Sequence, residues 1–196
     1  METMTTSIIL PFLVFFPFLG AVISYIIGRS NKGARDIWCW ILSAVIFIAS
    51  LMLIGKETVY SLRGFCGLGL SFVADGFGVI LAVLTGAIWL ITTIFSKEYM
   101  AAERNRNRYY FFVFLTLGAT MGIFLSADLF TTFIFFEIMS FTSFVLVMHD
   151  EEDFTVRSAK TYLAVAVIGG LVTLMGLFMM YQKAGTLNMT ELTAFM

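Results

Sequence analysis

The chain has 196 residues, of which 60% are hydrophobic and only 13% charged, and its formal net charge is -1. A soluble domain carries roughly 25% charged and 45–50% apolar residues, so this composition indicates a chain embedded in a membrane along its whole length. The near-neutral charge and the lack of a basic patch argue against binding to nucleic acid.

Six stretches are apolar enough to cross a bilayer, which requires about 20 predominantly apolar residues. In chain order they are 8–27, 37–54, 77–95, 109–127, 129–148 and 161–181. No basic residue precedes the first stretch, so we interpret it as a retained helix and not as a signal peptide. Pro11 and Pro17 lie in it and predict a kink or an irregular start. The sequence therefore predicts an all-α membrane protein with about six transmembrane helices.

Residues 58–72 (TVYSLRGFCGLGLSF) separate the second and third stretches. They are too rich in glycine for a helix and partly alternate in polarity, which predicts a short external β-hairpin. Asp75 follows, just before the third stretch. A carboxylate at that position can cap the free N–H groups of a helix. A place on an ion path is the alternative role for Asp75.

The basic residues predict the orientation. Nine of them fall in the three loops after the first, third and fifth stretches, and three fall on the opposite side. Because basic loops stay in the cytoplasm, we expect a multi-pass protein of the cell (inner) membrane with both termini extracytoplasmic.

Residues that could hold a cofactor are scarce. His149 is the only histidine, and Cys39 and Cys66 lie far apart in sequence. No Cys/His spacing is typical of zinc or iron–sulfur sites, and no glycine pattern of a nucleotide-binding loop precedes a helix. We expect no metal, no cofactor and no redox site in this chain, and two unpaired thiols.

Glu137 is the most informative residue. Eight residues of the stretch 129–148 (LFTTFIFFEIMSFTSFVLVM) precede it and eleven follow it, so it lies near mid-bilayer. A charged side chain there costs roughly 2.5–3.5 kcal/mol or more, which makes an intramembrane carboxylate a candidate functional group. A protonated glutamate that hydrogen-bonds between helices as a packing contact is the alternative. Asp128, the other acid of this region, can lie at the water interface between two spans or on an ion path.

Hydroxyls flank this carboxylate. Ser140 lies one helical turn from Glu137, and Ser143 lies one turn beyond Ser140. A carboxyl beside hydroxyls and water can relay protons, because burial raises its pKa while a nearby lysine lowers it. Lys160, at the start of the sixth stretch, either reaches to the interface or turns inward as a relay base.

Three segments carry a family resemblance: 126–148 (SADLFTTFIFFEIMSFTSFVLVM), 157–163 (RSAKTYL) and 185–192 (GTLNMTEL). They resemble the proton-conducting antiporter-like subunits of Mrp-type sodium/proton antiporters, NADH-quinone oxidoreductase and membrane-bound hydrogenases. The upstream segment 68–86 also fits, whereas the first two stretches fit only by hydropathy.

The resemblance implies that Glu137 matches the glutamate of the family's ion channel and that Lys160 occupies a recurrent basic position. The family's pump lysine lies in its seventh helix, before which this sequence stops. We therefore expect either a fragment or a split subunit, which a chain supplying the seventh helix onward completes. Within the sequence we separate residues 1–107 from residues 108–196, the first three helices of the family's repeat.

The expected function is translocation of protons, or exchange of sodium for protons, as one membrane subunit among others of a complex. A non-conducting structural or assembly module is the alternative. Whether the partners are those of an antiporter or of a redox enzyme of the NADH-quinone oxidoreductase type stays open, as does the choice between proton and sodium.

Overall fold

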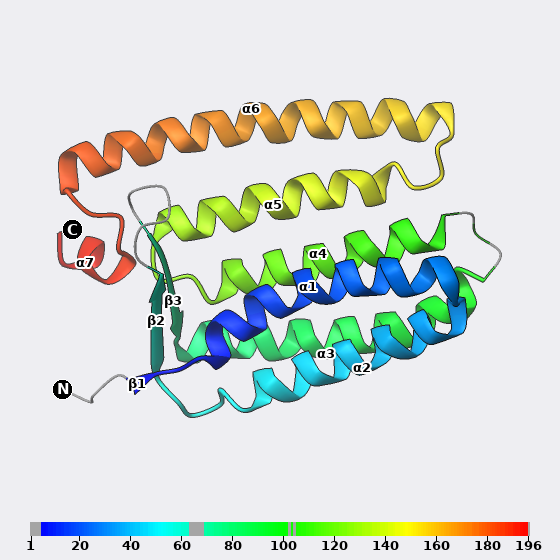
Figure 1. Cartoon of the computed structure of the whole chain (residues 1–196). Coiled ribbons are helices and arrows are strands. Elements are labelled where there is room, and N and C mark those ends of the chain that lie inside the picture. Colours follow the sequence, from blue (N-terminus) through cyan, green and yellow to red (C-terminus); the bar gives the residue numbers. More distant parts are fainter. Residues whose placement is uncertain (1–4, 63–68, 102, 104, 196) are drawn as a thin grey trace.

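The computed structural model describes residues 5–62, 69–101, 103 and 105–195. Long helices running side by side dominate it (Figure 1). In chain order the helices are α1 (Ile9–Ser30), α2 (Lys32–Leu51), α3 (Gly76–Tyr99), α4 (Arg106–Phe124), α5 (Leu129–Val147), α6 (Asp153–Ala184) and the short α7 (Met189–Phe195). The all-α membrane architecture predicted from the sequence is confirmed.

Among the described residues, five helices are long and apolar enough to span a membrane: α1, α2, α3, α5 and α6. The remaining predicted span, 109–127, corresponds to α4, which is less apolar because it begins with Arg106 and Arg108 and carries several small and polar residues. Nearly half of its positions are buried between neighbouring helices. α4 therefore depends less on lipid contact than the other helices do.

The helices form a layered bundle with α4 near its centre. α1 packs against α4 and α2, α2 packs against α3, and α4 packs against α5, which in turn carries α6. The contact of α1 with α4 is close, since a Cβ at Gly118 would lie 2.8 Å from the Val14 carbonyl oxygen. Because lipid is as apolar as leucine, such close packing stabilises helix association in a membrane. The contact also joins the two predicted regions, whose division at residue 108 stays a prediction.

A small sheet covers one end of the bundle. β2 (Thr58–Leu62) and β3 (Leu70–Ala74) pair antiparallel, which confirms the predicted hairpin. The segment between them, which includes Cys66, lies outside the described residues. β1 (Thr5–Thr6) adds a parallel third strand that the sequence pattern did not predict.

The hairpin is tied to the connection between α4 and α5. The Val73 N–H donates to the Leu125 carbonyl over 2.8 Å, and the Ala127 N–H donates to the Ser71 carbonyl over 2.8 Å. These bonds hold the hairpin and the start of α5 at the same end of the molecule. The loops that join α1 to α2, α3 to α4 and α5 to α6 lie at the opposite end, which we call the basic end (Figure 1).

Two helices begin at least five residues earlier than predicted. α6 starts at Asp153 and not at residue 161, and α2 starts at Lys32 and not at residue 37. The Asn31 side chain caps α2 by accepting from the Ala34 N–H over 3.1 Å. Hydropathy marks only the part of a helix inside the hydrocarbon, whereas charged turns extend it towards water.

Candidate functional site

Glu137 lies in the ninth position of α5, and its carboxyl faces α6. A Cβ built on Gly170 of α6 would lie 2.8 Å from both Cδ and Oε2 of Glu137. The carboxyl therefore occupies the space that the missing side chain of Gly170 leaves. Glu137 is half-buried, and no hydrogen bond to its carboxyl is found among the described residues. The carboxyl thus lies at a helix–helix contact and not on an outer surface.

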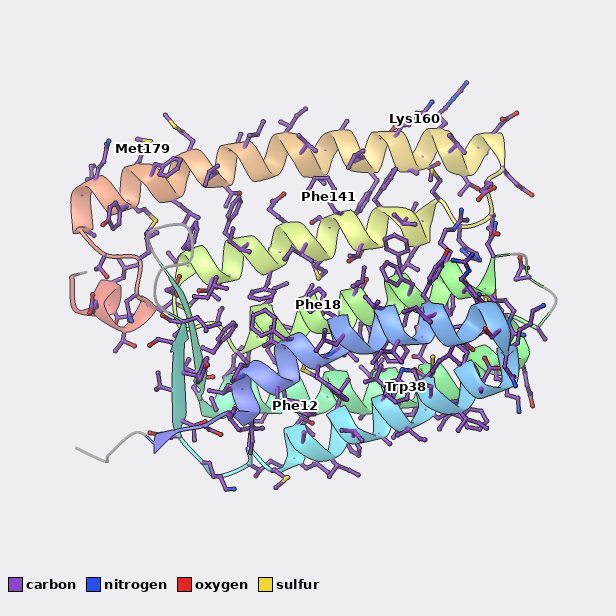
Figure 2. The ribbon with its side chains drawn as sticks, in the orientation of Figure 1. Phe12, Phe18, Trp38, Phe141, Lys160 and Met179 are labelled. Atoms are coloured by element: carbon purple, nitrogen blue, oxygen red, sulfur yellow. The ribbon has the colours of Figure 1, made fainter. Side chains whose placement is uncertain are left out.

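α6 meets the bundle along one narrow stripe. Its buried residues are Ala159, Gly170 and Leu177, whose spacing of eleven and seven residues repeats on one helical face. Gly170 lies within this stripe, at the level of Glu137. The remaining faces of α6 are exposed and rich in Val, Leu, Ile and Met, and Figure 2 shows their side chains projecting outward.

A groove of about 560 Å³ runs between α5 and α6. Phe136 and Ser140 line it from α5, and α6 contributes small and polar residues that include Gly169, Gly170 and Thr173. Most of its lining surface is apolar, but Ser140, Thr161, Tyr162 and Thr173 each bring a hydroxyl to it. Gly170 belongs both to this groove and to the contact with the Glu137 carboxyl.

The two predicted relay serines lie on the same helix as Glu137. Ser140 is buried and lines the groove, whereas Ser143 is half-buried. The structure thus brings Glu137, Ser140 and the α6 stripe together at one interface. A role for either serine in proton transfer stays a prediction.

Lys160 is not part of this contact. It lies ten residues before Gly170 in α6, which corresponds to roughly 15 Å along the axis at 1.5 Å per residue. Its side chain is exposed and projects from the outer side of α6 (Figure 2). Proton transfer between Lys160 and Glu137 would therefore need water or further side chains between them.

The two other predicted carboxylates cap helices. Asp75 accepts from the Gly78 N–H over 2.8 Å at the start of α3. Asp128 accepts from the Thr131 N–H and the Thr131 hydroxyl, each over 2.7 Å, at the start of α5. Each carboxylate satisfies N–H groups that a helix start leaves free. A further role on an ion path stays a prediction for both.

Two polar contacts were missed in the sequence. The hydroxyl oxygens of Thr116 in α4 and Thr142 in α5 lie 2.9 Å apart, and both residues are buried. Asp36 receives two hydrogen bonds from the fully buried Arg35, over 2.7 and 3.1 Å. Arg35 also donates to Asn107 and stacks over the Tyr110 ring at 4.6 Å. The sequence signal for the contact between Arg35 and Asp36 was this pair of opposite charges directly before the predicted span 37–54.

Potential metal ligands are dispersed. Within the part of the chain that the structure describes, no three side chains of the His, Cys, Asp or Glu type gather as ligands would. What the α5–α6 interface offers chemically is a single carboxyl with nearby hydroxyls, an arrangement that can bind or pass a proton.

Comparisons with known proteins point to one family. Residues 126–196, which hold α5 and α6, match the model of the transmembrane NADH:quinone oxidoreductase/Mrp antiporter family. A Na(+)/H(+) antiporter subunit from Alkalihalophilus pseudofirmus is 30% identical over 63% of this chain and 25% of its own length. A putative antiporter subunit mnhD2 of Staphylococcus aureus is 28% identical over 96% of this chain and 39% of its own length. This chain thus spans well under half of these relatives.

Solved structures share the fold. A chain of an archaeal respiratory complex, the membrane-bound sulfane sulfur reductase, superposes with a TM-score of 0.84 at 18% identity, over 93% of this chain and 39% of that one. A chain of the Mrp complex from Dietzia gives a TM-score of 0.82 at 20% identity, over 92% of this chain and 20% of that one. The family match over α5 and α6 and the relatives named as antiporter subunits make the chain similar to antiporter-like, multi-pass membrane subunits, and the solved structures show that it shares their fold.

Proposed function

We propose that this chain takes part in moving protons, or in exchanging sodium for protons, across a membrane, and that Glu137 is its intramembrane relay carboxylate. The observation that carries the proposal is the direction of Glu137, whose carboxyl lies against Gly170 at the α5–α6 interface and not on an outer face. An intramembrane carboxylate is costly to bury, so its retention at a helix contact with a nearby groove favours an ionisable function.

The similar proteins support the same proposed function. Relatives aligned with this chain are named as antiporter subunits, and the solved chains that share its fold come from multi-subunit membrane complexes. We infer that this chain also works beside other membrane subunits, with the exposed outer faces of α6 available for contacts. Lys160 lies on that outer side, where a partner's side chains or water could connect it to the path.

The test is ion transport in membrane vesicles that contain the complete assembly. Glu137→Gln keeps the size and hydrogen-bonding groups of the side chain but cannot ionise, so we expect it to abolish most gradient-driven proton movement. Glu137→Asp keeps a carboxyl and should retain part of the activity. The signal is the pH change inside the vesicles, read with a fluorescent dye at matched amounts of inserted protein.

The alternative function, a non-conducting packing module, makes the opposite prediction. If Glu137 serves only as a hydrogen-bonded contact between helices, Glu137→Gln preserves that contact and transport stays at the wild-type rate. Full transport by the Glu137→Gln assembly would therefore overturn the relay role. Loss of both transport and membrane insertion would indicate that Glu137 has a packing role, so insertion is measured for every variant.

A further inference from the structure

A pocket of about 900 Å³ opens at the basic end of the bundle, between the end of α1 and the starts of α2 and α4. One part of its wall is cationic and the other is aromatic. The cationic part includes Lys32, Arg106 and Arg108, and the aromatic part consists of Tyr25, Phe111 and Phe112. Neither the relay proposal nor the family match involves this pocket.

Two arginines of the cationic wall have hydrogen-bond donors that no described residue accepts. Arg106 lies 3.5 Å from Asp36, which is already bonded to Arg35, and Arg108 pairs with Glu151. The Nε atoms of both Arg106 and Arg108 are buried and have no hydrogen-bond partner among the described residues. Buried donors in proteins are normally satisfied, and no described residue satisfies these two.

Lys32 adds a charge without a counterion. It is exposed at the first position of α2 and forms no ion pair with any described residue. Among the described residues of the lining, Glu103 is the only acidic one. The lining therefore carries an excess of positive charge, which favours an anionic ligand.

The aromatic wall indicates which class of anion the pocket would bind. The rings of Tyr25 and Phe111 lie 5.8 Å apart at an angle of 66°, and Tyr25 is 42% exposed on the outer side of α1. Aromatic rings next to basic residues at the ends of spanning helices are typical of the level where lipid headgroups meet acyl chains. A soluble phosphate would use the cationic wall but would gain nothing from the rings.

We propose that this pocket binds the phosphate headgroup of an anionic phospholipid, with Lys32, Arg106 and Arg108 around the phosphate and the acyl chains passing Tyr25 and Phe111. Basic pockets between membrane helices recognise acidic headgroups in this way. The lipid would fill the space between α1, α2 and α4 at the basic end.

The experiment titrates the full chain, purified in detergent and delipidated, with phosphatidylglycerol, phosphatidylcholine or inorganic phosphate, and counts bound lipid by native mass spectrometry. We expect phosphatidylglycerol to bind about tenfold more tightly than phosphatidylcholine. Lys32→Gln should weaken phosphatidylglycerol binding about fivefold and Lys32→Gln with Arg108→Gln about 25-fold, since one basic residue near an anionic lipid contributes about 1 kcal/mol.

The matched control is the double variant Lys56→Gln with Lys183→Gln, which removes two exposed charges at the other end of the bundle. It should bind phosphatidylglycerol as the wild type does. The Lys32→Gln variant guards against misfolding, because Lys32 is exposed and forms no ion pair with described residues. Equal affinity for the two lipids, an unchanged affinity of both pocket variants, or displacement of phosphatidylglycerol by millimolar inorganic phosphate would overturn the proposal.

Discussion

Arg35 is the residue whose replacement we expect to cost the fold most. Its side chain is fully buried, bonded to Asp36 and stacked on Tyr110. Removing one partner of a buried ion pair typically costs about 3–5 kcal/mol, and without Arg35 the Asp36 carboxylate would keep only the longer contact with Arg106, at 3.5 Å. Arg35→Ala should therefore lower the free energy of unfolding by about that amount, measured by denaturant titration in detergent micelles.

Arg29→Ala provides the control for this prediction. Arg29 is an exposed arginine in the last turn of α1, so its removal changes the net charge equally without emptying a buried site. We expect a change within about 0.5 kcal/mol for it. Equal effects of the two substitutions would mean that the Arg35–Asp36 pair contributes no net stability.

His149 is expected to resist protonation. Its pKa is lowered from the ordinary value of 6.5, first by partial burial and then by the positive charge of Arg108, against the opposing effect of Asp150, Glu103 and Glu151. Because the folded-state pKa is depressed, His149 contributes stability above its unfolded pKa, and that contribution is lost as the pH falls through the folded value. The midpoint of its imidazole NMR titration should lie below 6.5. Removal of Arg108's charge in Arg108→Gln should raise that midpoint, and an unchanged or lower midpoint would contradict the electrostatic cause.

The pairing of α5 with α6 gives a second matched test. A Cβ at Gly170 would collide with the Glu137 carboxyl, whereas nothing lies within 4 Å of a Cβ at the adjacent Gly169. Gly170→Ala should displace either the carboxyl or α6 and so reduce both proton transport and the thermal unfolding midpoint. Gly169→Ala should leave transport intact and stabilise the helix by up to about 1 kcal/mol, because alanine favours helices more than glycine does. Equal behaviour of the two variants would show that the Glu137–Gly170 contact is unimportant.

Elements with strong composition signals were predictable, and contacts between them were not. α5 was predicted to within one residue because Asp128 caps its start and the apolar run ends at Met148. Glu137 stood out because it interrupts that apolar run. Gly170 could not be assigned as its neighbour, since the register of α5 against α6 is set by side-chain packing that periodicity does not encode. The start of α6 was predicted too late, because its first two turns contain charged residues and so lie outside the apolar run.

The same limit holds for the whole molecule: local signals predict its elements, but not the contacts between segments that are distant in sequence. The helical bundle and the hairpin follow from apolar runs and from a glycine-rich, alternating segment, both of which are local signals. β1 is two residues long and gives no pattern, and its pairing with β2 depends on where α1 starts. The basic-end pocket joins side chains from α1, α2 and α4, so it exists only once the bundle has formed.

The orientation of the bundle in the membrane is the prediction that concerns the molecule as a whole. Eight of the ten basic residues that the structure describes belong to the loops of the basic end and their flanking helix ends. Carrying one of these charges against a membrane potential of 100 mV costs about 2.3 kcal/mol, so the basic end should stay in the cytoplasm. The hairpin end, with Glu57, should then face outward.

Single cysteines test this orientation in intact cells. In a background in which Cys39 and Cys66 are replaced by alanine, Glu57→Cys reports on the hairpin end and Asp153→Cys on the basic end, and both positions are exposed. A maleimide that cannot cross membranes should label Glu57→Cys in intact cells and Asp153→Cys only after permeabilisation, because only the hairpin end would contact the outer solution. Labelling of Asp153→Cys in intact cells, with protection of Glu57→Cys, would reverse the orientation and place the proposed lipid pocket in the outer leaflet.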